Sequence, residues 1–312
     1  MRGQAHNYTS HVMHRFDAIF VPVAYAVGLF CLFIGNTLQV SGACCPLRSS
    51  GLFRVGIVWK LAGSICSTTA SGAHVLADKY AQREGSPRDE VDPVNRALDF
   101  PAAYLQFATS CILLSTNTCA IIAAFGGSAA SGVAIAARFL FLVAASIGLL
   151  STTLHVVSEI NRTLNIAILV RQLRQDLRQA NANTAFDIDS PTRNAAAARA
   201  VASFDFRHGH DVFLARNAAA FCPADFVAAI SPFVMASVVT NVCASATLLA
   251  GAILNIVWQR LASLIILEVA FILFITGVIL VLFVGATKVS AHRRGGRSHL
   301  LYDVNKTLRR VV

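Results

Sequence analysis

Six apolar stretches, joined by segments that alternate between rich and poor in Lys and Arg, constrain this chain more than any other feature. The stretches lie near 17–39, 52–77, 100–125, 133–157, 226–252 and 261–286. A helix that crosses the hydrocarbon core needs about 20 mostly apolar residues. Each stretch is long enough, although 52–77 is less apolar because Arg54 and Lys60 lie in its first half. The sequence therefore predicts an all-α fold, a polytopic membrane helix bundle with six transmembrane helices.

The basic residues predict which side of the membrane each segment faces. Segments 1–16, 78–99, 158–225 and 287–312 carry 21 of the 26 Lys and Arg residues. Positive residues accumulate in cytosolic loops, so both the N-terminus and residue 312 are expected in the cytosol. A G-protein-coupled receptor has the opposite orientation, because it begins outside the cell. We expect the first stretch to act as a signal anchor rather than as a cleaved signal peptide.

Composition and motifs narrow the classes of function. Hydrophobic residues make up 55% of the chain and charged residues 13%, far from the balance of a soluble domain. The net charge of +10 is expected to face anionic lipid headgroups, not a nucleic acid. The eight cysteines show no metal-binding spacing, and phosphate-loop, dinucleotide, nucleophile-elbow and zinc-protease motifs are absent. We therefore expect no enzymatic activity, no cofactor and no metal.

The segment 158–225 is predicted to form a cytosolic helical hairpin. Leu169, Leu173 and Leu177 recur at every fourth residue with arginines on the other faces, which predicts an amphipathic continuation of the fourth span. Residues 181–194 interrupt this helix, and a second arm leads into the fifth span. The arms are expected to pack between helices or subunits, or to lie on the inner leaflet.

Polar and aromatic residues within the spans supply a candidate ligand site. Glu268 is the one carboxylate well inside a span, where a charge costs about 2.5–3.5 kcal/mol on insertion scales, so it is expected to face protein or water. With Lys60 at a similar depth, an outward-opening pocket could be lined by Trp59, Asn117, Phe141, Asn241, Glu268 and Phe271. The alternative for each residue is a structural role, with asparagines bridging helices and aromatic rings packing in the bundle.

Three stretches carry a resemblance to a known family. Residues 210–223 (HDVFLARNAAAFCP) place an Asn and then an aromatic residue on the approach to the fifth span. The arms flanking 181–194 form a long loop between spans four and five, and 288–308 follows the sixth span with a basic, then amphipathic segment. In these features, and in its orientation, the chain resembles arthropod gustatory receptors and, more distantly, insect odorant receptors.

The resemblance implies a ligand-gated cation channel subunit of the plasma membrane that detects small tastant molecules. It implies a homo- or hetero-tetramer in which the cytosolic parts of helices four to six join the subunits. The family's pore is lined by a seventh span bearing Thr-Tyr, five apolar residues and Gln-Phe. Residues 287–312 are expected to lead to such a span, which this sequence lacks, so we expect a fragment or a truncated chain.

Two other functions remain open from the residues themselves. The first is a six-span secondary transporter in which Glu268 and Lys60 form a coupling pair. The second is a structural or adaptor membrane protein without transport activity. In all three cases the orientation places the glycosylation sequons at Asn7, Asn161 and Asn305 in the cytosol, where they would not be modified.

Overall fold

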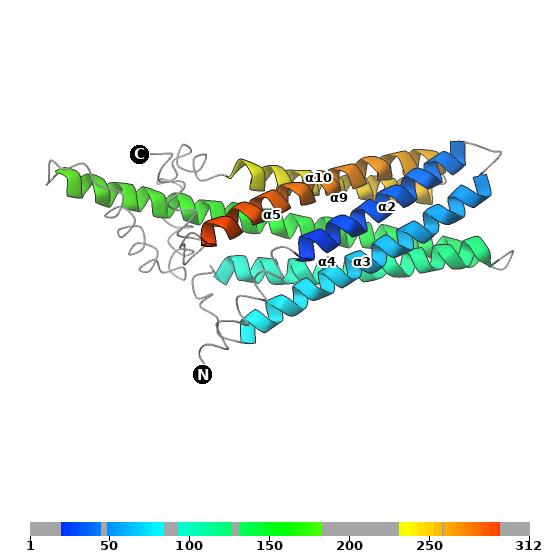
Figure 1. Cartoon of the computed structure of the whole chain (residues 1–312), viewed down its shortest axis with the longest axis horizontal. Coiled ribbons are helices and arrows are strands. Elements are labelled where there is room, and N and C mark those ends of the chain that lie inside the picture. The colour runs from blue at the N-terminus through cyan, green and yellow to red at the C-terminus, as the bar shows by residue number, and fades with distance from the viewer. Residues whose placement is uncertain are drawn as a thin grey trace. The chain divides into compact units, whose positions relative to one another are not determined.

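The computed structural model describes residues 20–44, 49–83, 93–126, 131–182, 231–257 and 259–293. Within these ranges the chain forms long α-helices and no strand, which agrees with the predicted all-α fold. The six helices are α2 (Val21–Cys44), α3 (Ser49–Arg83), α4 (Pro93–Phe125), α5 (Ser131–Ala182), α9 (Pro232–Ile256) and α10 (Arg260–Arg293). Figure 1 shows them as coloured ribbons.

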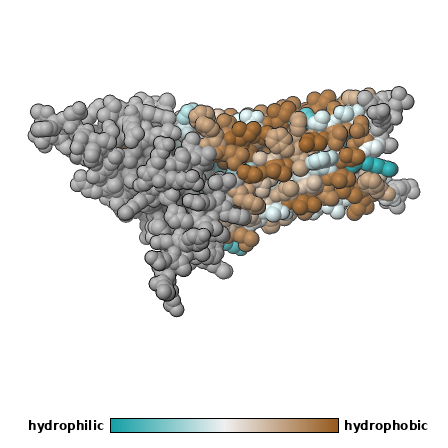
Figure 2. All heavy atoms as spheres, viewed as in Figure 1, coloured by the Kyte–Doolittle hydropathy of each residue, from teal (hydrophilic) through white to brown (hydrophobic). Residues whose placement is uncertain are grey.

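Five of the described helices are long and apolar enough to cross a membrane. The qualifying segments are Val21–Cys44, Ala97–Phe125, Ser131–Ile168, Pro232–Ile256 and Arg260–Phe283. Figure 2 shows apolar side chains covering most of the described surface of the helices. A lipid-facing helix needs such a surface, since hydrocarbon offers no partner for polar groups. The structure is therefore that of a multi-pass helical membrane protein.

Several helices extend beyond the apolar stretches that predict them. Helix α3 continues to Arg83 and α10 to Arg293, both into basic sequence. Helices α4 and α9 begin at Pro93 and Pro232. Proline suits the first turn of a helix, because the amide that it lacks has no partner there in any case. The polar residues at these helix ends are therefore helical although they lie outside the apolar stretches.

Helix α5 is the longest element, with 52 residues in one unbroken helix. Its apolar part ends near Ile168, and the helix continues to Ala182 through the Leu- and Arg-bearing sequence that predicted it. The second arm of the predicted hairpin lies outside the described residues, as does the tail after Arg293.

The chain divides into two compact units. The first unit comprises Met1–Glu84, Asp99–Val156 and Phe233–Gly285 and contains most of the apolar residues of the helices. The second comprises Gly85–Leu98, Val157–Pro232 and Ala286–Val312. Among its described residues, Ile166, Ala167 and Val170 of α5 are buried.

In the first unit, α2 and α3 pack antiparallel with their backbones in contact at two glycine pairs. A Cβ atom on Gly28 would lie 3.0 Å from the Gly63 carbonyl oxygen, and one on Gly35 would lie 2.6 Å from that of Gly56. Seven residues separate the glycines on each helix, the spacing of a helix face that follows its partner. Small residues at membrane helix contacts allow this close approach. The α2 and α3 backbones are therefore in direct contact at both glycine pairs.

An apolar core joins α2 to α5, α9 and α10. Its buried members are Leu32, Ala145, Leu248, Ala252, Leu267, Ala270 and Phe271. Buried hydroxyls add links between helices: Ser237 Oγ of α9 donates to the Gly277 carbonyl of α10 at 3.0 Å, and Ser263 Oγ donates back to that of Gly251 at 2.8 Å. Such hydroxyl-to-backbone bonds tie neighbouring membrane helices together.

Candidate functional site

A network of polar side chains joins α2, α3 and α10 within the first unit, and Glu268 of α10 lies at one end of it. Both carboxylate oxygens of Glu268 accept hydrogen bonds from α2. Asn36 Nδ2 donates to Oε2 at 2.6 Å, and the Thr37 hydroxyl donates to Oε1. The sequence predicts that this carboxylate faces protein or water, and in the structure neighbouring side chains of one helix donate to both of its oxygens.

Asn36 lies at the centre of the network and is completely buried. Its amide nitrogen also donates to the Leu264 carbonyl at 2.7 Å, so both of its N–H groups are used. Its carbonyl oxygen accepts a hydrogen bond from Lys60 Nζ at 2.9 Å. This arrangement orients the carboxamide, because the nitrogen faces the acid and the oxygen faces the base.

Lys60 of α3 lies at the other end of the network. Besides Asn36, its ammonium donates to Gln39 Oε1 at 2.5 Å. Asn36 and Gln39 are three residues apart on α2, a spacing that places them on one helix face. Gln39 is itself buried, with 6% of its surface exposed. Two amide oxygens of a single helix face therefore hold the ammonium.

The network extends to α4 through Asn117. Asn117 Nδ2 donates to Ser64 Oγ at 2.6 Å and approaches the Lys60 carbonyl oxygen at 3.4 Å. The Ser64 hydroxyl in turn donates to the Lys60 carbonyl at 3.0 Å. The helix turn that carries Lys60 is thereby fixed to a third neighbouring helix.

The three central residues lie at similar depths along their helices. Asn36 is eight residues before the end of α2 and Glu268 eight residues after the start of α10. At 1.5 Å per residue, each lies about 12 Å from the helix end, while Lys60 lies about 16 Å from the start of α3. A membrane core of about 30 Å would place this depth well inside the hydrocarbon.

The six predicted site residues fall into different environments. Glu268 and Asn117 belong to the network, and Phe141 packs against the apolar core that contains Phe271. Asn241 packs against Gly277 between α9 and α10. The Trp59 side chain is 40% exposed and makes no described contact with the network. The structure thus brings Glu268 and Asn117 into one network and the two phenylalanines into one core.

Sequence reasoning missed Asn36, Thr37 and Gln39. They stand together at the end of a run that is otherwise apolar, in the segment Asn36-Thr37-Leu38-Gln39. A group of polar residues in a membrane span is itself a signal of a protein-facing surface. The glycines at 28, 35, 56 and 63 gave a second signal, the seven-residue spacing that marks the contact between α2 and α3.

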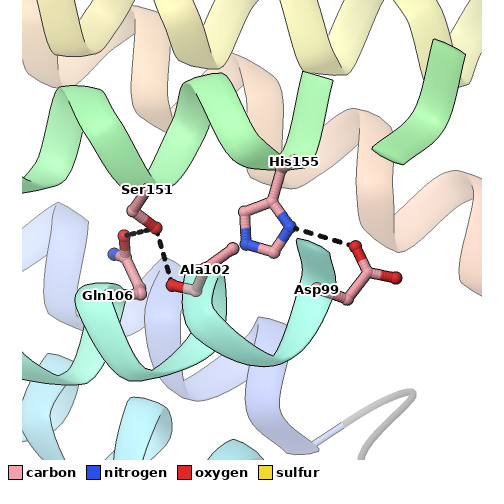
Figure 3. Close-up of polar contacts among 5 residues, drawn as sticks. All are labelled: Asp99, Ala102, Gln106, Ser151 and His155. Atoms are coloured by element: carbon pink, nitrogen blue, oxygen red, sulfur yellow. Dashed lines mark hydrogen bonds and ion pairs between the residues drawn. The ribbon is translucent and has the colours of Figure 1, made fainter. Parts of the chain in front are cut away.

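A second set of polar contacts joins α4 and α5 (Figure 3). The buried Ser151 hydroxyl donates to the Ala102 carbonyl at 2.8 Å and lies 3.5 Å from Gln106 Oε1. One turn further along α5, His155 Nδ1 is 3.8 Å from Asp99 Oδ1, and both side chains are about half exposed. Figure 3 shows His155 and Asp99 projecting from facing turns of the two helices. This pair resembles a surface ion pair, whereas Ser151 is part of the packed interior.

Charged groups mark both ends of α3. At its start, the Arg54 guanidinium lies over the Phe125 ring, 5.1 Å from the ring centroid. Near its end, Lys79 Nζ lies 5.4 Å from the centroid of Tyr104. Between Arg54 and Asp78, Lys60 is the one Lys, Arg, Asp or Glu residue of the helix. A basic residue beside an aromatic ring is typical of the zones where membrane meets water.

Within the described helices, no group of three or more His, Cys, Asp or Glu side chains is arranged to hold a metal ion. Comparisons with known proteins give no relative: no protein-family model matches the chain, and neither a curated protein nor a solved structure is significantly similar to it. The function therefore has to be argued from the residues of this chain.

Proposed function

We propose that the chain is a chemosensory receptor subunit of the gustatory type, with six membrane spans and a cytosolic N-terminus, in the plasma membrane. The observation that carries this proposal is α5. Its 52 residues correspond to about 78 Å, more than twice the thickness of the hydrocarbon core. A fourth span that continues as a long cytosolic helix is what the resemblance to gustatory receptors implies.

The charge distribution supports α3 as a further membrane span beside the five apolar helices, and it supports the proposed orientation of the chain. Arg54 and Lys79 of α3 are 25 positions apart, which corresponds to about 37 Å, enough to cross the core with one basic residue at each interface. Lys60 lies inside this span, where its hydrogen bonds to Asn36 and Gln39 reduce the cost of burying an ammonium. Arg54 would then face outside, and the basic extension of α5 would face the cytosol.

Ligand-evoked current is the direct test of the receptor proposal. Cells that express the full chain, alone and with other receptor subunits, are exposed to panels of sugars, bitter alkaloids and amino acids while membrane current is recorded. A cation current evoked by one panel member supports the proposal. Absence of evoked current in every combination, with the protein present at the cell surface, contradicts it.

The same proposal assigns the cytosolic part of α5 to subunit assembly into a homo- or hetero-tetramer. Ile160 is 37% exposed and lies three residues into the part of α5 beyond the first unit, which begins at Val157. Ile160→Pro breaks the helix there, while Ile160→Ala keeps it. Native electrophoresis is expected to show loss of the oligomer for the proline variant alone. Equal oligomer content in both variants would contradict the assembly role.

A second candidate function, secondary transport, is favoured by the connection between Lys60 and Glu268. An ionisable pair inside a membrane bundle marks a proton or substrate pathway in many transporters. Counterflow of radiolabelled sugars and amino acids into proteoliposomes tests this function independently of current. Saturable counterflow that Glu268→Gln abolishes would favour the transporter, and its absence the receptor.

A further inference from the structure

The side-chain atoms around Lys60 have the chemistry of a monovalent-cation site. Asn36 Oδ1 and Gln39 Oε1 accept hydrogen bonds from the ammonium at 2.9 and 2.5 Å. The Glu268 carboxylate is the next group in the network, one carboxamide away. Carbonyl and carboxylate oxygens are the ligands that hard cations prefer, and carbonyl oxygens of unwound backbone coordinate Na⁺ in membrane transporters.

Two glycines give this site its space. A Cβ atom on Gly35 of α2 would lie 2.9 Å from Lys60 Cγ, and one on Gly56 of α3 would lie 2.8 Å from Gln39 Cγ. Each glycine therefore accommodates the side-chain stem of the residue on the opposite helix. The reciprocal arrangement brings the ammonium and the amide oxygens together at the closest part of the α2–α3 contact.

One negative and one positive side chain of the membrane helices, Glu268 and Lys60, are connected at this site. Between Asp17 and Asp78, Asp99 and Glu159, and Asp225 and Asp303, the sequence contains one acidic residue, Glu268. Lys60 is the cation that the network connects to it through Asn36. Glu268 is half-buried, and a carboxylate withdrawn from water is destabilising without a countercharge. The ammonium of Lys60 therefore supplies the positive charge that a bound cation would supply.

We propose that the amide oxygens of Asn36 and Gln39, with the Glu268 carboxylate one carboxamide away, form a monovalent-cation site whose resident cation is the protein's own Lys60 ammonium. A free alkali-metal ion, Na⁺ or K⁺, takes this place when the ammonium is removed. The natural chain therefore needs no dissolved cation to neutralise Glu268. This inference does not depend on whether the protein is a receptor or a transporter.

The test is a gain of cation dependence in the purified full chain. Lys60→Met removes the charge while keeping a long unbranched side chain, and Lys60→Met/Glu268→Gln removes both charges. Melting temperatures are measured in sodium, potassium and choline chloride at one ionic strength. The natural chain and the double variant are expected to melt alike in all three salts. Lys60→Met is expected to melt several degrees higher, in a saturable manner, with sodium or potassium than with choline.

The proposal is overturned if Lys60→Met melts at the same temperature in the three salts, or if the double variant shows the same salt preference. Because Lys60→Met leaves the half-buried Glu268 carboxylate without a countercharge, this variant is also extracted from membranes in parallel in sodium, potassium and choline. Recovery of monodisperse protein with an alkali cation but not with choline supports the site. Failure with all three salts contradicts it, whether or not the double variant is recovered, because the proposal attributes the defect to charge alone.

Discussion

The Asn36 carboxamide donates a 2.6 Å hydrogen bond to the Glu268 carboxylate, although 232 residues separate the two in the sequence. The same carboxamide accepts a hydrogen bond from Lys60, so one neutral side chain lies between an acid and a base. Asn36 of α2 therefore links α3 to α10 through hydrogen bonds of one side chain.

Asn36→Leu is expected to destabilise the protein by about 2 kcal/mol, because it leaves hydrogen-bonding capacity of Lys60 and Glu268 unsatisfied inside the bundle. Unfolding in mixed detergent micelles measures the change. Thr69→Val is the matched control, since the exposed Thr69 hydroxyl donates only to the Ile65 carbonyl of its own helix. Equal stability of the two variants would show that Asn36 is not a bridge.

Gly35→Ala is expected to cost about 1–3 kcal/mol, because its Cβ atom would lie 2.6 Å from the Gly56 carbonyl oxygen and push the helices apart. Gly51→Ala of α3 adds the same methyl group where nothing lies within 4 Å. The control is expected to be neutral or slightly stabilising, since alanine favours a helix more than glycine does. The same unfolding assay measures the stability of both variants. Similar stabilities for Gly35→Ala and Gly51→Ala would contradict the α2–α3 contact.

Gly277→Ala and Asn241→Ala are expected to be coupled. A Cβ atom on Gly277 would overlap the Asn241 side-chain oxygen, so the glycine variant forces that side chain to move. Shortening Asn241 removes the overlap. The double variant should therefore be more stable than the sum of the single changes predicts, by about 1 kcal/mol in a double-mutant cycle. Additive effects would show that the two residues do not meet.

Ser151→Ala and His155→Ala are expected to differ although the residues are one turn apart. The fully buried Ser151 bonds to the Ala102 carbonyl, and membrane hydrogen bonds of this kind contribute about 0.6 kcal/mol. His155 and Asp99 are 42% and 50% exposed, so their pairing is screened by solvent and contributes no more than about 0.5 kcal/mol. Thermal unfolding at low and high salt, at a pH acidic enough to protonate the imidazole, separates them, because only the His155 contribution then depends on ionic strength.

No glycan is expected at Asn161 of α5, or at Asn7 and Asn305, which lie outside the described residues. The proposed orientation keeps all three in the cytosol, away from the glycosylation machinery. Treatment of the expressed chain with an endoglycosidase is therefore expected to leave its electrophoretic mobility unchanged. A mobility shift that Asn161→Gln abolishes would reverse the orientation.

Much of the fold could be predicted from the sequence because apolar runs of membrane length have few alternatives to helix. The ends of helices were less predictable: α10 continues through Lys288 to Arg293, where apolar content no longer marks the helix. The sequence also did not show which face of each helix points toward the interior of the bundle. Lipid-facing and buried positions are both apolar in such helices, so nothing local indicated that Trp59 is exposed whereas Phe271 is buried.

The two charged residues of the candidate site could be predicted from the sequence. Glu268 is conspicuous as a single acid in an apolar span, and Lys60 as a base at similar depth. Their connection was not readable, because it runs through Asn36 on a third helix and depends on how α2 rotates. An asparagine in a span signals a polar contact without identifying its partner.

The two glycine pairs between α2 and α3 have a mechanical consequence. Gly28 faces Gly63 and Gly35 faces Gly56, with the same seven-residue interval on both helices. If one helix moved along the other by a single turn, residues larger than glycine would face the backbone carbonyl oxygens that the glycines face now. Their side chains would collide with those oxygens. The pair therefore keeps its register, and α2 and α3 would move as one rigid body in any rearrangement of the bundle.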